Sequence, residues 1–205
     1  MLKTAADWIT AARFLLALAL FGILEWAAEL PPTERAMPAW LAFWVFVVAA
    51  LTDTIDGAVA RRTGMSDFGR VADPFVDKVL VVGALVFLAA VKESATCVPP
   101  WAVVVIVARE FLVTGVRGYA ESKGLAFPAD SWGKTKMVLQ CLTVGGAILI
   151  LVIPSLGAQP GAFFEFLPWL TRALLGLTLL ITVTSGAGYF LRAWRFFSTT
   201  AAARP

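Results

Sequence analysis

Four aspartates between positions 53 and 77 are the part of the sequence best suited to chemistry. They are Asp53, Asp56, Asp73 and Asp77. The first two are three residues apart and the last two are four apart, so each pair would share one face of a helix. The chain contains no histidine, and carboxylates without imidazole or thiolate select hard ions such as Mg²⁺ or Mn²⁺. The spacing therefore predicts a site for two divalent ions that clamp a diphosphate during phosphoryl transfer.

Small residues and an arginine accompany these aspartates. Gly57, Ala60 and Gly69 would let a bulky ligand approach the helix backbone, and Arg61 offers a bidentate partner for phosphate. Each glycine alone is more often used for tight helix packing, and Arg61 alone could simply mark the cytoplasmic side. Four carboxylates together resist a purely structural explanation, because one ionised aspartate at the centre of a membrane helix costs about 2.5 to 3.5 kcal/mol.

The composition indicates that membrane helices position these charges. Of the 205 residues, 60% are hydrophobic and 15% are charged, and the mean hydropathy is +0.82. A membrane span needs about 20 apolar residues, so the content matches about six spans and excludes a soluble domain. The absence of histidine excludes Ser-His-Asp hydrolysis and His-ligated zinc. The two cysteines, Cys97 and Cys141, lack the spacing of a disulfide framework.

Six apolar runs are the predicted helices. They cover residues 8–26, 37–60, 74–91, 100–118, 134–153 and 172–191, with Pro74 in the first turn of the third. A signal peptide is the alternative for the first run, but Asp7 and Arg13 disfavour it. Eleven lysines and arginines fall on one predicted side and three on the other, which predicts that both termini are cytoplasmic.

We therefore expect an all-α integral membrane protein with six transmembrane helices. A single membrane domain would cover residues 1–197, followed by a short tail over 198–205. The net charge of +3 is explained by this topology and does not indicate nucleic acid as a partner.

The aspartates belong to a longer pattern that resembles the signature of the CDP-alcohol phosphotransferase family. It reads D-x2-D-G-x2-A-R from Asp53 to Arg61 and G-x3-D-x3-D from Gly69 to Asp77, with every fixed position present. The resemblance implies that the four aspartates hold two divalent ions, Mg²⁺ or Mn²⁺, and that Asp77 is also the general base. It also implies the family's fold, a homodimer, and an active site at the cytoplasmic face of a bacterial inner membrane.

The same resemblance implies where the cytidine diphosphate part of a lipid substrate binds. Its contacts correspond to Gly57, Ala60, Arg61, Ser66 and Gly69. The segment Ile9-Thr10-x-x-Arg13 is similar to the family's L-T-x-x-R segment, which would place Thr10 beside the nucleotide.

Basic residues outside the signature are the best guide to the acceptor alcohol. Arg109 and Arg117 lie two turns apart on the predicted fourth helix, and Lys134 and Lys136 begin the fifth. Together they suit an acceptor that carries its own phosphate. The alternative is that Glu110 pairs with a lysine or arginine and that the cluster is structural.

Two segments, 108–117 and 131–140, also resemble bacterial phosphatidylglycerophosphate synthases, one branch of the family, although Met137 replaces their usual threonine. The resemblance implies transfer of the phosphatidyl group from CDP-diacylglycerol to glycerol 3-phosphate, with release of CMP. The nearest alternative is a family member that uses inositol phosphate, phosphatidylglycerol or serine. A cation transporter is the alternative from another class, but the acids gather at one predicted end and leave no acidic path across the membrane.

Overall fold

The computed structural model describes residues 5–63, 67–122, 132–157 and 160–202, and the side chains of residues 7–52, 72–120, 135–157 and 160–188. Over these ranges the chain forms seven α-helices and two short 3-10 helices, and no strand. They are α1 (Ala5–Glu29), η1 (Pro32–Glu34), α2 (Ala36–Thr63), α3 (Asp67–Ala90), α4 (Lys92–Ala95), α5 (Pro100–Ser122), α6 (Trp132–Ile150), η2 (Ile153–Leu156) and α7 (Ala162–Ala202). The all-α prediction is confirmed for the described residues.

The six long helices follow the six predicted apolar runs, but two of them begin earlier than expected. Helix α3 begins at Asp67, so Pro74 lies inside the helix and not in its first turn. Helix α7 begins at Ala162, so Pro168 and Arg172 are also internal. Hydropathy detects only the apolar part of a helix, and a proline removes a single backbone hydrogen bond, which a long helix tolerates. The prediction of both starting points was therefore wrong.

Two helical stretches in the described part of the chain are long and apolar enough to cross a membrane. These are Asp7–Glu29 and Ala162–Gly188, and shorter apolar stretches cover Ala36–Thr52 and Thr135–Ile150. The length and composition of these helices support a membrane protein. The count of six spans and the cytoplasmic position of the termini stay predictions.

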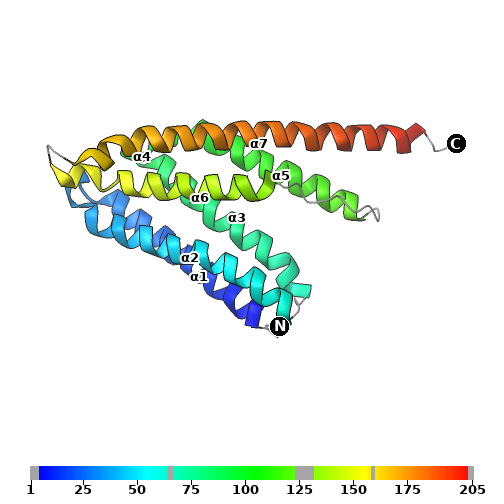
Figure 1. Ribbon diagram of the computed structural model, residues 1–205, viewed down its shortest axis with the longest axis horizontal. Helices are drawn as coiled ribbons and strands as arrows, with labels where there is room; N and C mark the ends of the chain where they lie inside the picture. Colours follow the sequence, from blue (N-terminus) through cyan, green and yellow to red (C-terminus); the bar gives the residue numbers. More distant parts are fainter. Residues whose placement is uncertain (1–4, 64–66, 123–131, 158–159, 203–205) are drawn as a thin grey trace.

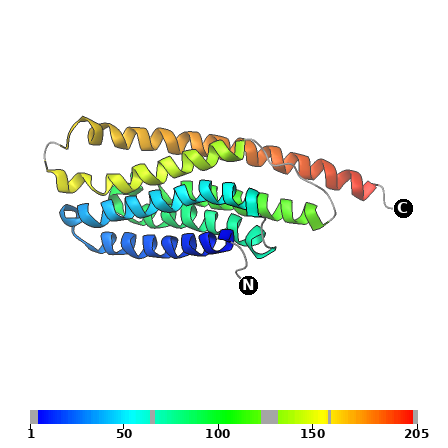
Figure 2. The ribbon, with the colours of Figure 1, turned by 60° about the horizontal axis from the view of Figure 1, so that its bottom comes forward.

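The helices form a bundle in which α2 and α3 join two groups, since α2 also packs against α6 (Figure 1). Helix α1 packs against α2 and α3, α7 packs against α5 and α6, and α3 also contacts α5 and α6. We call the region around η1, α4 and η2 the η end, because η1 contacts η2 there. The region where α1 and α3 begin is the N end, and both chain termini point away from the η end (Figures 1 and 2).

Small and branched apolar side chains fill the centre of the bundle. Ala17, Leu20, Ala42, Ala84 and Ile148, from four helices, are all completely or almost completely buried in one cluster. Alanines let neighbouring helix backbones approach closely, as is common in membrane bundles. Because α1 contributes to this core, it is an integral helix of the bundle. The core fixes α1 against α3, and this contact positions the aspartates.

Candidate active site

The first part of the site forms where α1 lies against the beginning of α3. Arg13 forms an ion pair with Asp77, and the Thr10 hydroxyl donates a hydrogen bond to Asp73. Thr10 and Arg13 are three apart on one helix, and the aspartates are four apart on the other, so the two contacts lie side by side. The Arg13 side chain is 1% exposed, whereas that of Asp77 is 24% exposed. The carboxylate is thus held from the α1 side and stays accessible.

The donor chemistry of this part of the site suits a hard divalent cation. Asp73 and Asp77 place two carboxylates on one side of α3, and carboxylate oxygens are ligands that Mg²⁺ and Mn²⁺ prefer. Asp53 and Asp56 lie in α2, but their side chains are outside the described residues. Among the described side chains no group of three ligating residues occurs. The positions of Asp73 and Asp77 are consistent with the predicted metal site. The site made by all four aspartates stays a prediction.

The predicted cytidine diphosphate contacts fall largely outside the described side chains. Gly57, Ala60 and Arg61 belong to α2 and Gly69 belongs to α3, and Ser66 lies outside the described residues. Thr10 is described, and its hydroxyl contacts Asp73. The sequence had placed Thr10 beside the nucleotide, and the structure adds a direct contact to one of the predicted metal ligands.

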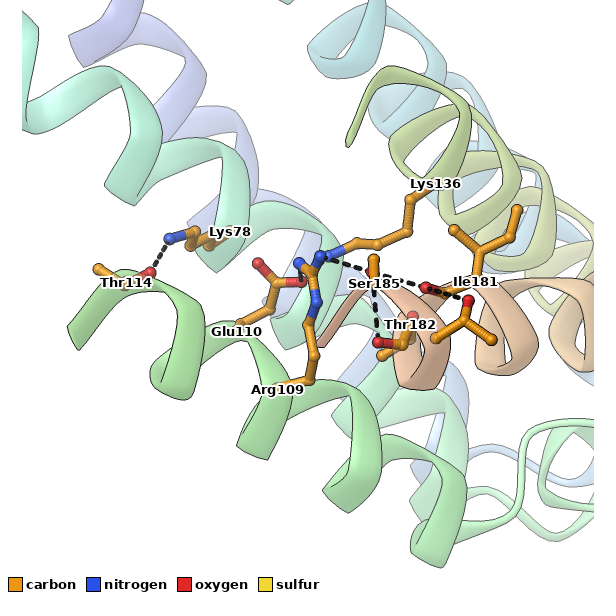
Figure 3. Close-up of polar contacts among 9 residues, drawn as sticks. Lys78, Arg109, Glu110, Thr114, Lys136, Ile181, Thr182 and Ser185 are labelled. Carbon is orange, nitrogen blue, oxygen red and sulfur yellow. Dashed lines mark hydrogen bonds and ion pairs between the residues drawn. The ribbon is translucent and has the colours of Figure 1, made fainter. Parts of the chain in front are cut away.

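Helix α3 connects the aspartates to a second group of polar residues. Lys78, the neighbour of Asp77, donates a hydrogen bond from its ammonium group to the Thr114 hydroxyl of α5 (Figure 3). Successive residues of an α-helix point about 100° apart, because the helix has 3.6 residues per turn. Asp77 therefore faces α1 while Lys78 faces α5.

The second group is a buried charge cluster made by α5, α6 and α7. Arg109 Nη1 lies 3.2 Å from Glu110 Oε1, and Lys136 Nζ pairs with the same oxygen. Arg109 Nη2 donates a hydrogen bond to Ser185 Oγ at 2.8 Å. Figure 3 shows the Arg109 guanidinium between Glu110 and Ser185, with Lys136 reaching in from α6. Four residues from three helices thus form one polar network.

Comparison with known proteins identifies the family. The sequence model of the CDP-alcohol phosphatidyltransferase family matches residues 3–185. The chain belongs to this family. It is similar to the CDP-diacylglycerol–glycerol-3-phosphate 3-phosphatidyltransferase of Bacillus subtilis, with 32% identity over 88% of this chain and 85% of that protein. The Rickettsia bellii enzyme of the same name is 31% identical over 81% of this chain and 83% of its own.

A third relative carries a related name. The probable phosphatidylglycerophosphate synthase of Mycobacterium tuberculosis is 32% identical over 76% of this chain and 66% of its own length. Since the family model spans most of the chain, the resemblance inferred from the aspartate signature is confirmed. As a member of the CDP-alcohol phosphatidyltransferase family, the protein is an enzyme.

In this phosphatidyltransferase the predicted acceptor residues are partly brought together. Arg109 and Lys136 meet across α5 and α6 through Glu110. Arg117 lies two turns further along α5 and is half-buried, and Lys134 belongs to α6 with its side chain outside the described residues. Glu110 pairs with two cations, as the structural alternative predicts, and the role of the basic residues as acceptor contacts stays a prediction. Both features describe one cluster.

Four contacts of this phosphatidyltransferase were not predicted from sequence. They are Arg13 to Asp77, Thr10 to Asp73, Lys78 to Thr114, and Ser185 to Arg109. A signal existed for Arg13, because a buried arginine in an apolar run needs an anionic partner. A weaker signal existed for Ser185, which is three residues after Thr182 and seven after Thr178, and all three are buried on one face of α7.

Proposed function

We propose that the protein transfers the phosphatidyl group of CDP-diacylglycerol to sn-glycerol 3-phosphate and releases CMP. The observation that carries this proposal is the complete aspartate signature in a chain whose relatives named for that reaction match it over most of its length. The product would be phosphatidylglycerophosphate. The charge cluster around Arg109 adds support, because guanidinium and ammonium groups suit an acceptor that carries a phosphate.

Asp77 is the general base in this proposal. It accepts the proton of the acceptor hydroxyl while the resulting alkoxide attacks the phosphorus that carries the lipid. The bond between that phosphorus and the CMP oxygen breaks, and CMP leaves with the electron pair. Arg13 orients the Asp77 carboxylate, and the exposed fraction of Asp77 leaves room for the hydroxyl to approach.

The four aspartates would hold two divalent ions, Mg²⁺ or Mn²⁺. Such ions would neutralise the negative charge that develops on the departing CMP as the diphosphate bond breaks. The Thr10 hydroxyl supports Asp73 from α1 and so couples α1 to this part of the site. Gly57, Ala60, Arg61, Ser66 and Gly69 are the proposed contacts to the cytidine diphosphate.

Four basic residues are proposed to bind the phosphate of the acceptor. They are Arg109, Arg117, Lys134 and Lys136. Because Lys78 is adjacent to Asp77 and contacts Thr114 of α5, the base and the α5 cluster are linked through two neighbouring side chains. An acceptor bound by its phosphate at α5 and α6 would direct a hydroxyl toward α3.

We further propose a homodimer in a bacterial inner membrane, with six spans and the active site at the cytoplasmic face. The six long helices and the position of both termini away from the η end support this topology. The distribution of lysines and arginines in the sequence supports its orientation.

An acceptor assay tests the proposed function. Purified protein in detergent receives CDP-diacylglycerol and Mg²⁺ or Mn²⁺, and then glycerol 3-phosphate, inositol phosphate, phosphatidylglycerol or serine in separate reactions. We expect CMP and phosphatidylglycerophosphate, identified by mass spectrometry, in the reaction that contains glycerol 3-phosphate, and no CMP in the reactions with the other three acceptors. Turnover only with another acceptor would replace the proposed acceptor, and cation flux in vesicles without CMP formation would favour a transporter.

A further inference from the structure

Glu110 lies at the centre of the charge cluster, and the proposed reaction assigns it no role. Its Oε1 atom contacts both Arg109 and Lys136. The side chains are largely removed from solvent, with exposed fractions of 12% for Arg109, 15% for Glu110 and 7% for Lys136. One carboxylate therefore serves two basic side chains.

Arg109 is held in place by a second contact that does not involve Glu110. Ser185 Oγ accepts a hydrogen bond from Arg109 Nη2 at 2.8 Å, and the serine hydroxyl itself donates to the Ile181 carbonyl at 2.6 Å. Ser185 is therefore oriented by its own helix and presents a lone pair to the guanidinium (Figure 3). If Glu110 turned away, this contact would still hold Arg109.

The shared carboxylate limits which anions can bind here. Buried cations need a counter-ion, and Glu110 supplies one. A phosphate that binds Arg109 and Lys136 must therefore compete with the Glu110 carboxylate for these two basic groups. A monoanion that replaces one carboxylate brings no additional charge, whereas a phosphate monoester carries about −1.5 to −2 near neutral pH and so brings more negative charge than the carboxylate that it displaces.

We propose that Glu110 competes with the acceptor's phosphate for Arg109 and Lys136. A dianionic phosphate monoester binds strongly enough to displace the Glu110 carboxylate, whereas a monoanion does not. Glu110 is then a specificity-determining residue of the acceptor site. The inference rests on the proposed function, because it takes Arg109 and Lys136 as the groups that receive the acceptor's phosphate.

The variant Glu110→Gln tests this competition, because it keeps the side-chain shape and removes the charge. We expect the KM for glycerol 3-phosphate to fall about tenfold, the factor that corresponds to about 1.4 kcal/mol, while the KM for CDP-diacylglycerol is unchanged. Calorimetric titration of the variant with glycerol 3-phosphate should show the same gain in affinity. An unchanged or raised KM for glycerol 3-phosphate would overturn the proposal.

Two inhibitors test this difference between dianion and monoanion in the unmodified enzyme, independently of how the variant folds. Glycerol 2-phosphate is dianionic, and its methyl phosphodiester is a monoanion of similar size. We expect the monoester to compete with glycerol 3-phosphate and the diester to have at least about a tenfold higher inhibition constant. Equal inhibition by the two compounds would overturn the proposal. In Glu110→Gln the inhibition constant of the diester should fall by a larger factor than the KM for glycerol 3-phosphate does, so that the discrimination between monoester and diester narrows.

Glu93→Gln is the matched control, since it makes the same chemical change at a carboxylate paired with an arginine at the η end. We expect it to leave both KM values unchanged. The two proposals fail separately: no phosphatidyl product from glycerol 3-phosphate in the unmodified enzyme overturns the function, whereas normal product with an unchanged KM in Glu110→Gln overturns only the role of Glu110.

Discussion

Two arginine–carboxylate pairs stand at opposite ends of the bundle. At the N end, Arg13 of α1 pairs with Asp77 of α3. At the η end, Arg35 pairs with Glu93 of α4, donates from Nε to the Leu30 carbonyl at 2.9 Å and from Nη2 to the Ala28 carbonyl at 3.2 Å. Both arginines are buried. The pairs share their chemistry and differ in what surrounds them.

The surroundings assign the two pairs different roles. Arg35 satisfies backbone carbonyls where α1 ends, a position at which helices leave carbonyl groups without intrahelical partners. Arg13 instead contacts an aspartate of the family signature, beside a second aspartate held by Thr10. A buried ion pair alone is weak evidence for stability. The comparison therefore predicts that the η-end pair supports the fold and that the N-end pair supports catalysis.

The largest expected effect comes from neutralising the carboxylate at the N end. Asp77→Asn should lower the rate of CMP release by about 10³-fold or more, because the variant keeps the side-chain shape and removes the proposed general base. The monodisperse peak in size-exclusion chromatography should be retained. Near-normal CMP release would remove Asp77 from the mechanism and with it the functional half of the comparison.

The arginine of the N-end pair should matter nearly as much. We expect Arg13→Gln to lower kcat by about 10²-fold, since a misplaced catalytic group can cost a factor of that size. Arg13→Lys, which retains the charge, should recover part of the loss. The KM for glycerol 3-phosphate should change little in both variants. If Arg13→Gln and Arg13→Lys lose the same fraction of kcat and are destabilised to the same extent in thermal unfolding, Arg13 is a structural residue like Arg35.

At the η end the effect should be on stability. Arg35→Ala leaves the Glu93 carboxylate and two backbone carbonyls without their partner, which we expect to lower the free energy of unfolding by about 2 kcal/mol. Unfolding in detergent, followed by circular dichroism, measures the change. The specific activity of the folded fraction should equal that of the unmodified enzyme. A reduced kcat at unchanged stability would break the contrast between the two ends.

The smallest effect is expected for Thr10. Thr10→Val removes the hydrogen bond to Asp73, which is worth about 1 kcal/mol and corresponds to about fivefold in kcat/KM for CDP-diacylglycerol. Thr10→Ser keeps the hydroxyl and serves as the control, with near-normal kcat/KM expected. If serine and valine reduce activity equally, the methyl group of Thr10, and not its hydroxyl, supports the site.

Much of the fold was predictable because its signals are local. The apolar runs predict each of the six long helices, since hydrophobic length is what membrane burial requires. The starting points of α3 and α7 were not predictable in this way. Polar residues from Asp67 onward continue the helix without contributing to hydropathy, and α7 continues through Pro168, which removes only one backbone hydrogen bond.

The sequence by itself determined the helical class, the family and the aspartates available for chemistry, because apolar length and signature spacing lie within short stretches of chain. Only the tertiary structure decided which charges meet. Arg13 reaches Asp77 across 64 positions, and Glu110 of α5 joins Arg109 to Lys136 of α6. These contacts depend on how the helices pack against one another. Packing is decided by the fit between the surfaces of two helices, which cannot be read from the sequence of either helix alone.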